Sequence, residues 1–356
     1  SGERDVPVWS LADDWTMVPS TMTHAFPSGT KEAYRLRLAS GRELVATANH
    51  PFRTVHGWAR LDELEPGSRI ATPRVVGSPE HLRRAEPDEL AAMVQASLDD
   101  GRVPAEVFSL VEDQLATVIS GIFGGVGSLG VGTLRGRPHV RLTATSTKRR
   151  LIDDLQTLLL RFGILARITD VGSNRPRWRL WIHGSDHQRE FLRRIGVAGE
   201  RGRECEAALA ALEGVTPNPN CDTIPCEVRD LVVAELARVG MTQRDLAAAL
   251  GEQYCGGYLL GTEARPRSSS RARLARIADA IESKELAALA HSDVFWDEVA
   301  EITPLGKRPV YDATVLGTHN FVANGVVVHN SIEQDADVVM FIYRDEVYNE
   351  NTDKLN

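Results

Sequence analysis

The chain has 356 residues, of which 42% are hydrophobic, and carries a formal net charge of −8. This length exceeds that of one compact core, so we expect two or three domains. No apolar run reaches membrane-spanning length, so we expect no membrane partner. The acidic balance argues against a protein devoted wholly to nucleic acid, although local basic patches are compatible with it. The four cysteines form no CxxC pair, which indicates reduced thiols in a cytoplasmic protein rather than a zinc site.

The first 75 residues have the character of β-structure. The segments Arg35–Leu38 and Glu43–Ala46 flank Ser40-Gly41 and predict a hairpin. The sequence TANHPF follows at residues 47–52. A histidine in such a segment has by default a structural role, so this motif gains meaning only from its context.

The middle of the chain alternates helical and strand patterns. Residues 76–100 are polar and helical, with predicted helix starts at Pro79 and Pro87. Residues 114–130 are apolar and rich in glycine toward their end. An amphipathic helix from residue 148 precedes a strand with apolar residues on one face and Arg177, Arg179 and Trp181 on the other. Such a face could follow phosphates, but a charged face on a half-buried sheet without DNA is at least as good an interpretation.

Residues 228–282 have the pattern of a helix-turn-helix unit. Thr242 is a predicted N-cap, with Asp245 three residues later, and the sequence TQRDLAAALG resembles the first helix and turn of a phage-repressor-like domain. A basic cluster nearby offers DNA contacts through Arg265, Arg267, Arg271, Arg273 and Arg276. A purely structural helical insert is an equally good interpretation.

Residues 319–331, HNFVANGVVVHNS, predict a tight β-hairpin. Asn324-Gly325 between two apolar runs favours a two-residue turn with positive φ at both positions. This register places His319 opposite Asn330 and Asn320 opposite His329. An asparagine can cleave its own backbone by attacking its carbonyl with its side-chain nitrogen. A partner for that nitrogen and a donor to the carbonyl oxygen would accelerate the reaction. The alternative is an ordinary surface hairpin.

The segment VYDATVLGTHNFVANGVVVHN, followed by serine, closely resembles the C-terminal splicing motifs of inteins. The sequence after it, SIEQDADVVMFIYRDEVYNENTD, looks like a replicative DnaB-type helicase resuming behind a splice junction. The chain resembles an intein of an actinobacterial helicase of this kind along almost its whole length. The resemblance implies an all-β Hint (horseshoe) splicing module at residues 1–75 and 289–330. It further implies an α/β LAGLIDADG-like endonuclease region at 76–225, a helical HTH-like insert at 226–288, and a host helicase segment, the C-extein, at 331–356.

The resemblance also implies roles for individual residues. Thr47 and His50 would polarise and twist the peptide bond at the N-terminal junction, with His50 protonated for the leaving amide. Asp312 would carry protons between the two junctions, or it is a hydrogen-bonded structural aspartate. Asn330 would cyclise with help from His319 and His329, after a hydroxyl attack by the residue that follows it, Ser331. No cofactor is needed for this chemistry.

The N-terminus departs from the family pattern. Inteins of this kind begin with a Cys or Ser nucleophile on a strand that precedes a VWSL segment, which here already stands at Val8–Leu11. We therefore expect the first splicing block to lie outside this chain, either in a longer protein or in a separate N-terminal partner fragment. The alternative is that Ser1 is the nucleophile of a shortened module. Without the first block, only cleavage between Asn330 and Ser331 is expected.

The endonuclease region departs from the family as well. In active enzymes an acidic residue at the end of the motif helix binds a divalent metal, but the matching position here is Val126, which cannot ligate Mg²⁺. The sequence LAAMVQASLDDG could be a remnant of the partner motif, with Asp99 or Asp100 as its acids, yet a solvated helix end is the better interpretation. We expect no double-strand cutting and a role for Mg²⁺ only if that activity survived.

The sequence is also compatible with two other functions. One is a DNA-binding or DNA-cutting protein in which splicing is incidental. The other is the activity of the host, which after splicing would be a hexameric ATP-dependent helicase. The chain contains no GxxxxGK[ST] motif, so we expect this segment by itself neither to hydrolyse ATP nor to unwind DNA.

Overall fold

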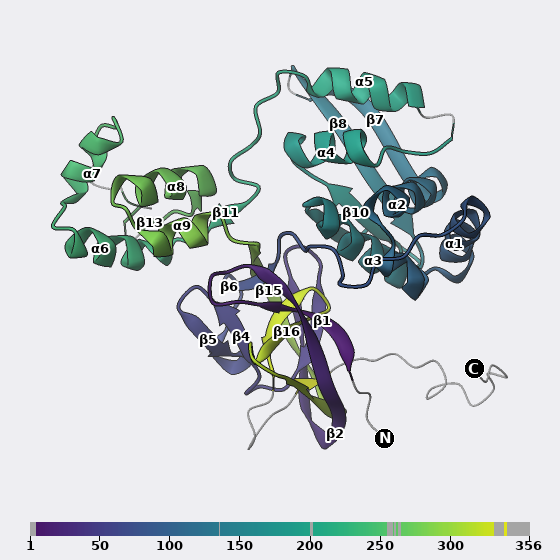
Figure 1. Ribbon diagram of the computed structural model, residues 1–356, viewed down its shortest axis with the longest axis horizontal. Coiled ribbons are helices and arrows are strands. Elements are labelled where there is room, and N and C mark those ends of the chain that lie inside the picture. Colours follow the sequence, from purple (N-terminus) through teal and green to yellow (C-terminus); the bar gives the residue numbers. More distant parts are fainter. Residues whose placement is uncertain are drawn as a thin grey trace.

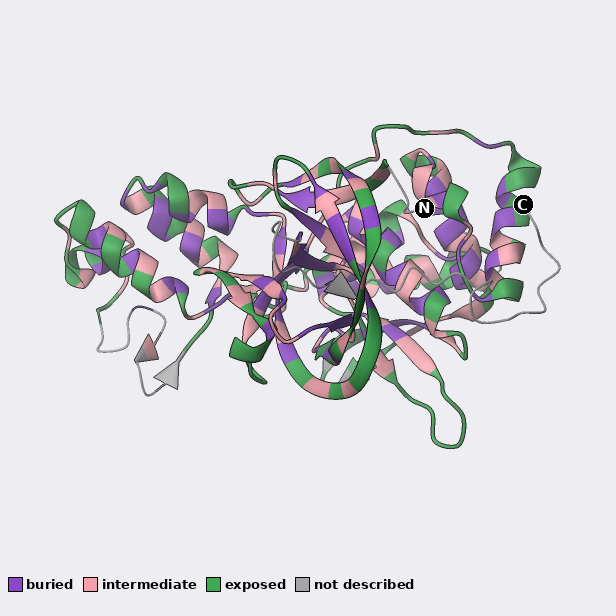
Figure 2. Ribbon diagram, turned by 90° about the horizontal axis from the view of Figure 1, so that it is seen from below, coloured by how far each residue is buried: buried purple, intermediate pink, exposed green. Residues whose placement is uncertain are grey.

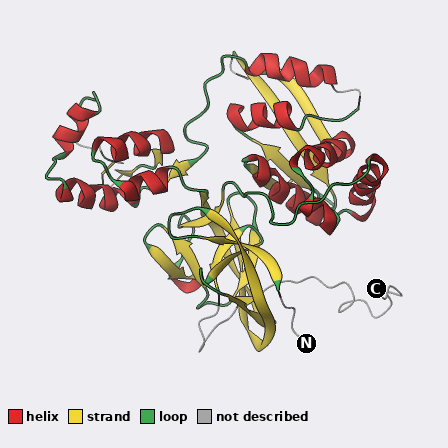
Figure 3. Ribbon diagram, viewed as in Figure 1, coloured by secondary structure: helices red, strands yellow, loops and turns green. Residues whose placement is uncertain are grey.

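The computed structural model describes residues 5–134, 136–199, 202–254, 259, 261–262, 265–330 and 338–339. They form a β-rich module built from both ends of the described chain, an α/β region and a helical region (Figures 1 and 3). Within these residues, no helix combines the length and the apolar character needed to cross a membrane.

A long antiparallel ribbon of β2 (Met17–Leu38) and β15 (Val294–Val315) is the frame of the β-rich module. One sheet has the order β1-β2-β3-β18-β15-β6, and a second has the order β16-β17-β4-β5. The remaining strands are β1 (Val6–Leu11), β3 (Glu43–Ala46), β4 (Pro51–Thr54), β5 (Gly57–Arg60), β6 (Arg69–Pro73), β16 (Asn320–Ala323), β17 (Val326–His329) and β18 (Val338–Val339). Figure 2 shows that the middle of the ribbon is largely exposed, whereas both of its ends enter the core.

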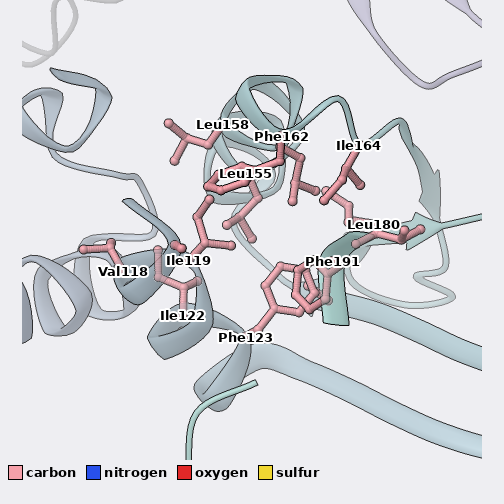
Figure 4. Packing of buried hydrophobic residues seen from close by; sticks show 14 of the residues in the cluster. Val118, Ile119, Ile122, Phe123, Leu155, Leu158, Phe162, Ile164, Leu180 and Phe191 are labelled. Atoms are coloured by element: carbon pink, nitrogen blue, oxygen red, sulfur yellow. The ribbon is translucent and has the colours of Figure 1, made fainter. Parts of the chain in front are cut away.

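The α/β region places helices on one face of a four-stranded sheet with the order β7-β8-β10-β9. Its elements are α1 (Pro87–Asp100), α2 (Glu112–Val126), β7 (Gly127–Leu134), β8 (Arg137–Ser146), α3 (Arg149–Leu159), β9 (Ala166–Asp170), β10 (Trp178–Ile182), α4 (Ser185–Arg194) and α5 (Gly202–Leu212). Figure 4 shows the core between helices and sheet, where the rings of Phe123 and Phe191 lie 4.6 Å apart.

Two glycines allow α1 and α2 to pack closely. A Cβ on Gly121 would collide with Val94, and a Cβ on Gly125 would collide with Leu98. The contact of Gly121 with Val94 is followed, four residues later on each helix, by the contact of Gly125 with Leu98, so the two helices run parallel. Their C-terminal ends, at Asp100 and Val126, therefore lie on the same side of the pair.

The helical region consists of α6 (Val228–Arg238), α7 (Gln243–Ala249), α8 (Arg271–Ala280) and α9 (Lys284–Ala290), with short strands β11 (Thr223–Ile224), β12 (Gly261–Thr262), β13 (Arg265–Pro266) and β14 (Ser269–Ser270). The predicted cap of α7 is present: Asp245 N donates to Thr242 Oγ1, and Thr242 N donates to Asp245 Oδ2. The buried core of this region is continuous with Leu11, Trp296 and Val327 of the β-rich module. The helices therefore pack around a core that they share with one end of the β-rich module.

Candidate functional site

The C-terminal hairpin has the predicted register. Strands β16 and β17 pair Asn320 with His329 and Ala323 with Val326. The turn residues Asn324 and Gly325 have φ angles of 47° and 74°, as a two-residue turn with positive φ at both positions requires. The pairing continues beyond the strands, because Asn330 N donates to His319 O at 2.9 Å.

His329 contacts the backbone carbonyl that would be cleaved. Its Nδ1 lies 2.6 Å from Asn330 O, and the Nδ1–H tautomer donates a hydrogen bond to this oxygen. Trp58 of β5 packs edge-to-face on the imidazole, with the ring centroids 4.8 Å apart. The half-buried imidazole of His329 therefore lies between the indole of Trp58 and the Asn330 carbonyl oxygen, to which it donates a hydrogen bond.

The side chain of Asn330 is buried, with 5% of the residue exposed. Its Nδ2 donates to Val315 O, at the end of β15, at 2.9 Å. Its Oδ1 is buried and has no hydrogen-bond partner among the described residues. The hydrogen bond from Nδ2 to Val315 O therefore fixes the orientation of this side chain in the buried site.

The structure corrects the prediction for His319. Its side chain is exposed, and the amide nitrogen of Asn330 donates to Val315 rather than to this imidazole. The physical reason is the φ angle of His319, which is 53°. A residue with positive φ at the end of a turn does not follow the alternation of side chains along a strand, so a facing position in the register does not bring the side chains together.

Thr47 and His50 are both buried on the segment between β3 and β4, with 3% and 2% of each residue exposed. His50 N donates to Thr47 O at 3.2 Å, which closes the turn of the TANH sequence. Burial lowers the pKa of His50 to about 3, with a smaller contribution from the nearby charge of His329. Burial therefore favours the neutral imidazole in the resting chain, whereas the role expected at the junction calls for a protonated one. Its Nε2 is buried and has no hydrogen-bond partner within the described part of the chain.

Asp312 is buried on β15 and pairs with Phe26 of β2. It lies on the same strand as Val315, whose carbonyl holds the Asn330 amide. Ser331 lies outside the described residues. Farther on, Val338 and Val339 pair with Ala46 and Val45 of β3, just before Thr47.

The sequence analysis did not predict the structural role of Asn320. Its buried side chain donates from Nδ2 to Leu11 O at 2.8 Å and accepts from Leu11 N at Oδ1 at 2.7 Å. Ser10 Oγ donates to the Asn320 backbone carbonyl at 2.7 Å. Asn320 thus joins β1 to the hairpin base. The sequence gives no signal for this contact, because its partners lie more than 300 positions away.

The structure also corrects the prediction that Arg271 contacts DNA. Its guanidinium is largely buried and donates to Asp222 Oδ2 at 2.8 Å, to Ala290 O at 3.2 Å and to Val294 O. This arginine satisfies the carbonyls at the end of α9 and ties the helical region to β15.

The other arginines of the predicted basic cluster differ from one another. Arg273 and Arg276 both pair with Glu252, at 2.9 and 3.0 Å, which neutralises part of their charge. Arg267 is exposed. Arg265 lies in β13, and its side chain falls outside the described part of the structure. Among the arginines of this cluster whose side chains the structure describes, Arg267 alone is exposed and makes no ion pair with a described residue.

Val126 ends α2, where the sequence places it, and it packs partly buried against the core of the α/β region. Asp99, near the end of the neighbouring α1, accepts a hydrogen bond from Gln95 within its own helix. Valine has no donor atom for a divalent cation, so the residues present at this pair of helix ends do not fit a metal. Among the described residues, no group of three or more His, Cys, Asp or Glu side chains could hold a metal ion.

Comparisons with known proteins find relatives along almost the whole chain. The replicative DNA helicase DnaB of Rhodothermus marinus is 32% identical to the chain, over 99% of this chain and 46% of that protein. The DnaB helicase of Nostoc sp. is 30% identical, over 99% and 49%. The chain thus spans about half the length of these curated relatives. The crystal structure of the Ssp DnaB mini-intein variant M86 aligns with 16% identity and a TM-score of 0.33, over 94% of this chain and 81% of that one.

A family model settles the family. The model for the intein splicing domain matches residues 2–330. This range includes the whole hairpin, the TANH segment and both inserted regions. The chain therefore belongs to the intein splicing-domain family.

Proposed function

We propose that this intein cleaves its own backbone between Asn330 and Ser331, as the C-terminal step of protein splicing in a DnaB-type replicative helicase. The observation that carries the proposal is the contact of 2.6 Å between His329 Nδ1 and the carbonyl oxygen of Asn330. It supplies a donor at the atom on which negative charge develops when the carbonyl is attacked.

In the proposed step, Asn330 Nδ2 attacks the carbonyl carbon of its own residue. A five-membered succinimide ring forms, and the bond to the nitrogen of Ser331 breaks. The attacking nitrogen loses one proton, and the departing amine gains one. His329 stabilises the developing oxyanion through Nδ1–H. Val315 O holds the amide in the buried site until attack.

The earlier steps of splicing involve the other candidate residues. A Cys or Ser nucleophile at the N-terminal junction forms an ester or thioester, which the Ser331 hydroxyl then attacks. Thr47 and a neutral His50 polarise the peptide bond there, and the buried Nε2 of His50 is available for that contact. Asp312 carries protons between the junctions. An ester-to-amide shift then completes the host chain, without a cofactor, and the host assembles as a cytoplasmic hexamer.

Replacing Asn330 tests this function. Asn330→Ala removes the attacking nitrogen and should abolish release of residues 331–356, as measured by intact-mass spectrometry. The matched control is Asn220→Ala, which changes an exposed asparagine far along the chain from the hairpin and should cleave at the unmodified rate. Cleavage by Asn330→Ala at that same rate would show that another group breaks the bond.

A second candidate function, DNA recognition by a degenerate LAGLIDADG-type endonuclease, is favoured by the parallel packing of α1 and α2. The sheet face opposite the helices also carries Arg141 and Arg167, which are exposed, and a stacked pair of Trp181 and His183 with centroids 5.7 Å apart. The lack of an acid at Val126 argues against cutting. The test is a plasmid with the uninterrupted helicase gene, incubated with Mg²⁺. We expect binding at low salt without cleavage. Absence of binding would exclude this second function, and nicking would show that the endonuclease is still active.

A further inference from the structure

The tip of the C-terminal hairpin is held by a turn of the first half of the β-rich module. Asn324 Nδ2 donates to Glu43 O at 3.3 Å. The side chain of Arg42 lies so close to Gly325 that a Cβ at this glycine would collide with its Nε. Residues 40–43, which we name the docking turn, therefore form the surface on which the hairpin tip packs.

The docking turn also contacts the α/β region. Ser40 O accepts hydrogen bonds from Ile168 N at 2.8 Å and from Gln156 Nε2 at 3.1 Å. Gly41 O accepts from Arg149 Nη2 at 2.5 Å. Gly41 has a φ angle of 84°, and a Cβ there would collide with the backbone of Ile168. Only glycine permits this close approach between the two regions.

Charge from both regions surrounds Arg42. The residue is buried, with 5% exposed. Burial lowers the pKa of its guanidinium, and the carboxylates of Asp297 on β15 and Asp153 on α3 oppose that effect. A buried charge is tolerated when it is compensated nearby. Here one carboxylate comes from the β-rich module and the other from the α/β region, so displacement of α3 leaves Arg42 with less compensation.

We propose that Arg42, Arg149 and Gln156 are positioning residues for the cleavage at Asn330, so that the α/β region takes part in splicing. This inference rests on the proposed function. The hairpin is held at its tip by the docking turn, along β17 by the pairing of Val328 with Phe52, and at its base by Asn320. Releasing the tip allows the hairpin to tilt, and a displacement of about 1 Å between reacting groups can slow a reaction about a hundredfold.

The test uses Arg149→Ala in the full chain, because this residue lies in the α/β region and leaves the splicing module unchanged. We expect cleavage at Asn330 to slow about fivefold or more, since a charge-assisted hydrogen bond to the docking turn is lost. Two matched controls should keep the original rate. Arg150→Ala removes an exposed arginine at the next position of α3. Arg189→Ala removes a guanidinium that donates to Leu212 O and Val215 O inside the α/β region.

Further variants separate positioning from simple loss of stability. Arg149→Lys should recover part of the rate, because it keeps a cationic donor. Arg42→Ala combined with Arg149→Ala should be no slower than Arg42→Ala alone, because both act through the docking turn. If Arg42→Ala does not fold, as judged by circular dichroism, Gln156→Ala takes its place in this double-mutant comparison with Arg149→Ala.

The outcomes distinguish the two proposals. Equal cleavage rates for Arg149→Ala and Arg150→Ala would overturn the positioning inference and leave the proposed function intact. Continued cleavage by Asn330→Ala would overturn the proposed function itself. A slow Arg189→Ala would also refute the inference, because that change lowers the stability of the α/β region without touching the docking turn.

Discussion

Replacing His329 by alanine removes the donor that lies 2.6 Å from the carbonyl oxygen of Asn330. In a partly buried site this hydrogen bond strengthens as the oxygen becomes negative during attack. Loss of one such donor costs about 100- to 1000-fold in rate, or about 3–4 kcal/mol of transition-state stabilisation. We expect His329→Ala to slow cleavage by about this factor while Asn330 remains in place.

The assay follows the release of residues 331–356 from the full chain by intact-mass spectrometry over time. His56→Ala is the matched control, because it removes an exposed histidine between β4 and β5 of the same sheet. His329→Gln should recover part of the rate, because the glutamine side chain keeps a hydrogen-bond donor. The cleavage rate of this variant should not change with pH through titration of residue 329, because glutamine does not titrate. Equal rates for His329→Ala and His56→Ala would refute the proposed role of this hydrogen bond.

Two further predictions concern stability. The pKa of His50 in the folded chain, about 3, lies below its ordinary value of 6.5, so the unfolded chain takes up the proton first as the pH falls. The stabilising contribution is thus complete above pH 6.5 and declines toward pH 3. His50→Gln should remove about 2 kcal/mol of the stability lost between pH 7 and about pH 5, measured by urea unfolding; an unchanged pH dependence would contradict this. Asn320→Ala leaves Leu11 N and O without their partner and should lower stability by about 3 kcal/mol, whereas a loss no larger than that of Asn220→Ala would count against it.

The hairpin could be predicted because its geometry is local. The Asn324-Gly325 turn fixes the register by itself, and the register fixes which backbone groups pair. The contact of His329 with the adjacent carbonyl is likewise made within two residues. A local rule of this kind also placed the cap of α7 at Thr242.

The features that sequence reasoning missed depend on contacts between distant segments. The side chain of His319 is exposed because this residue has a positive φ. No residue type near it in the sequence predicts that conformation. The neutral state of His50 follows from burial by the whole β-rich module. Arg271 resembles a surface arginine in sequence, yet Asp222 and the carbonyls of another segment surround it. The docking turn was predicted only as a hairpin, because its second partner, Ile168, lies far along the chain.

The most direct test of the central claim is the mass of the fragment that ends at Asn330, determined at the earliest time of cleavage. Attack by the Asn330 side chain predicts a C-terminal succinimide, so this fragment is lighter by one water molecule than the product of hydrolysis at the same bond. If the fragment instead carries the full mass of the hydrolysed peptide from the first time point, an external water cleaves the bond, and Asn330 is not the nucleophile.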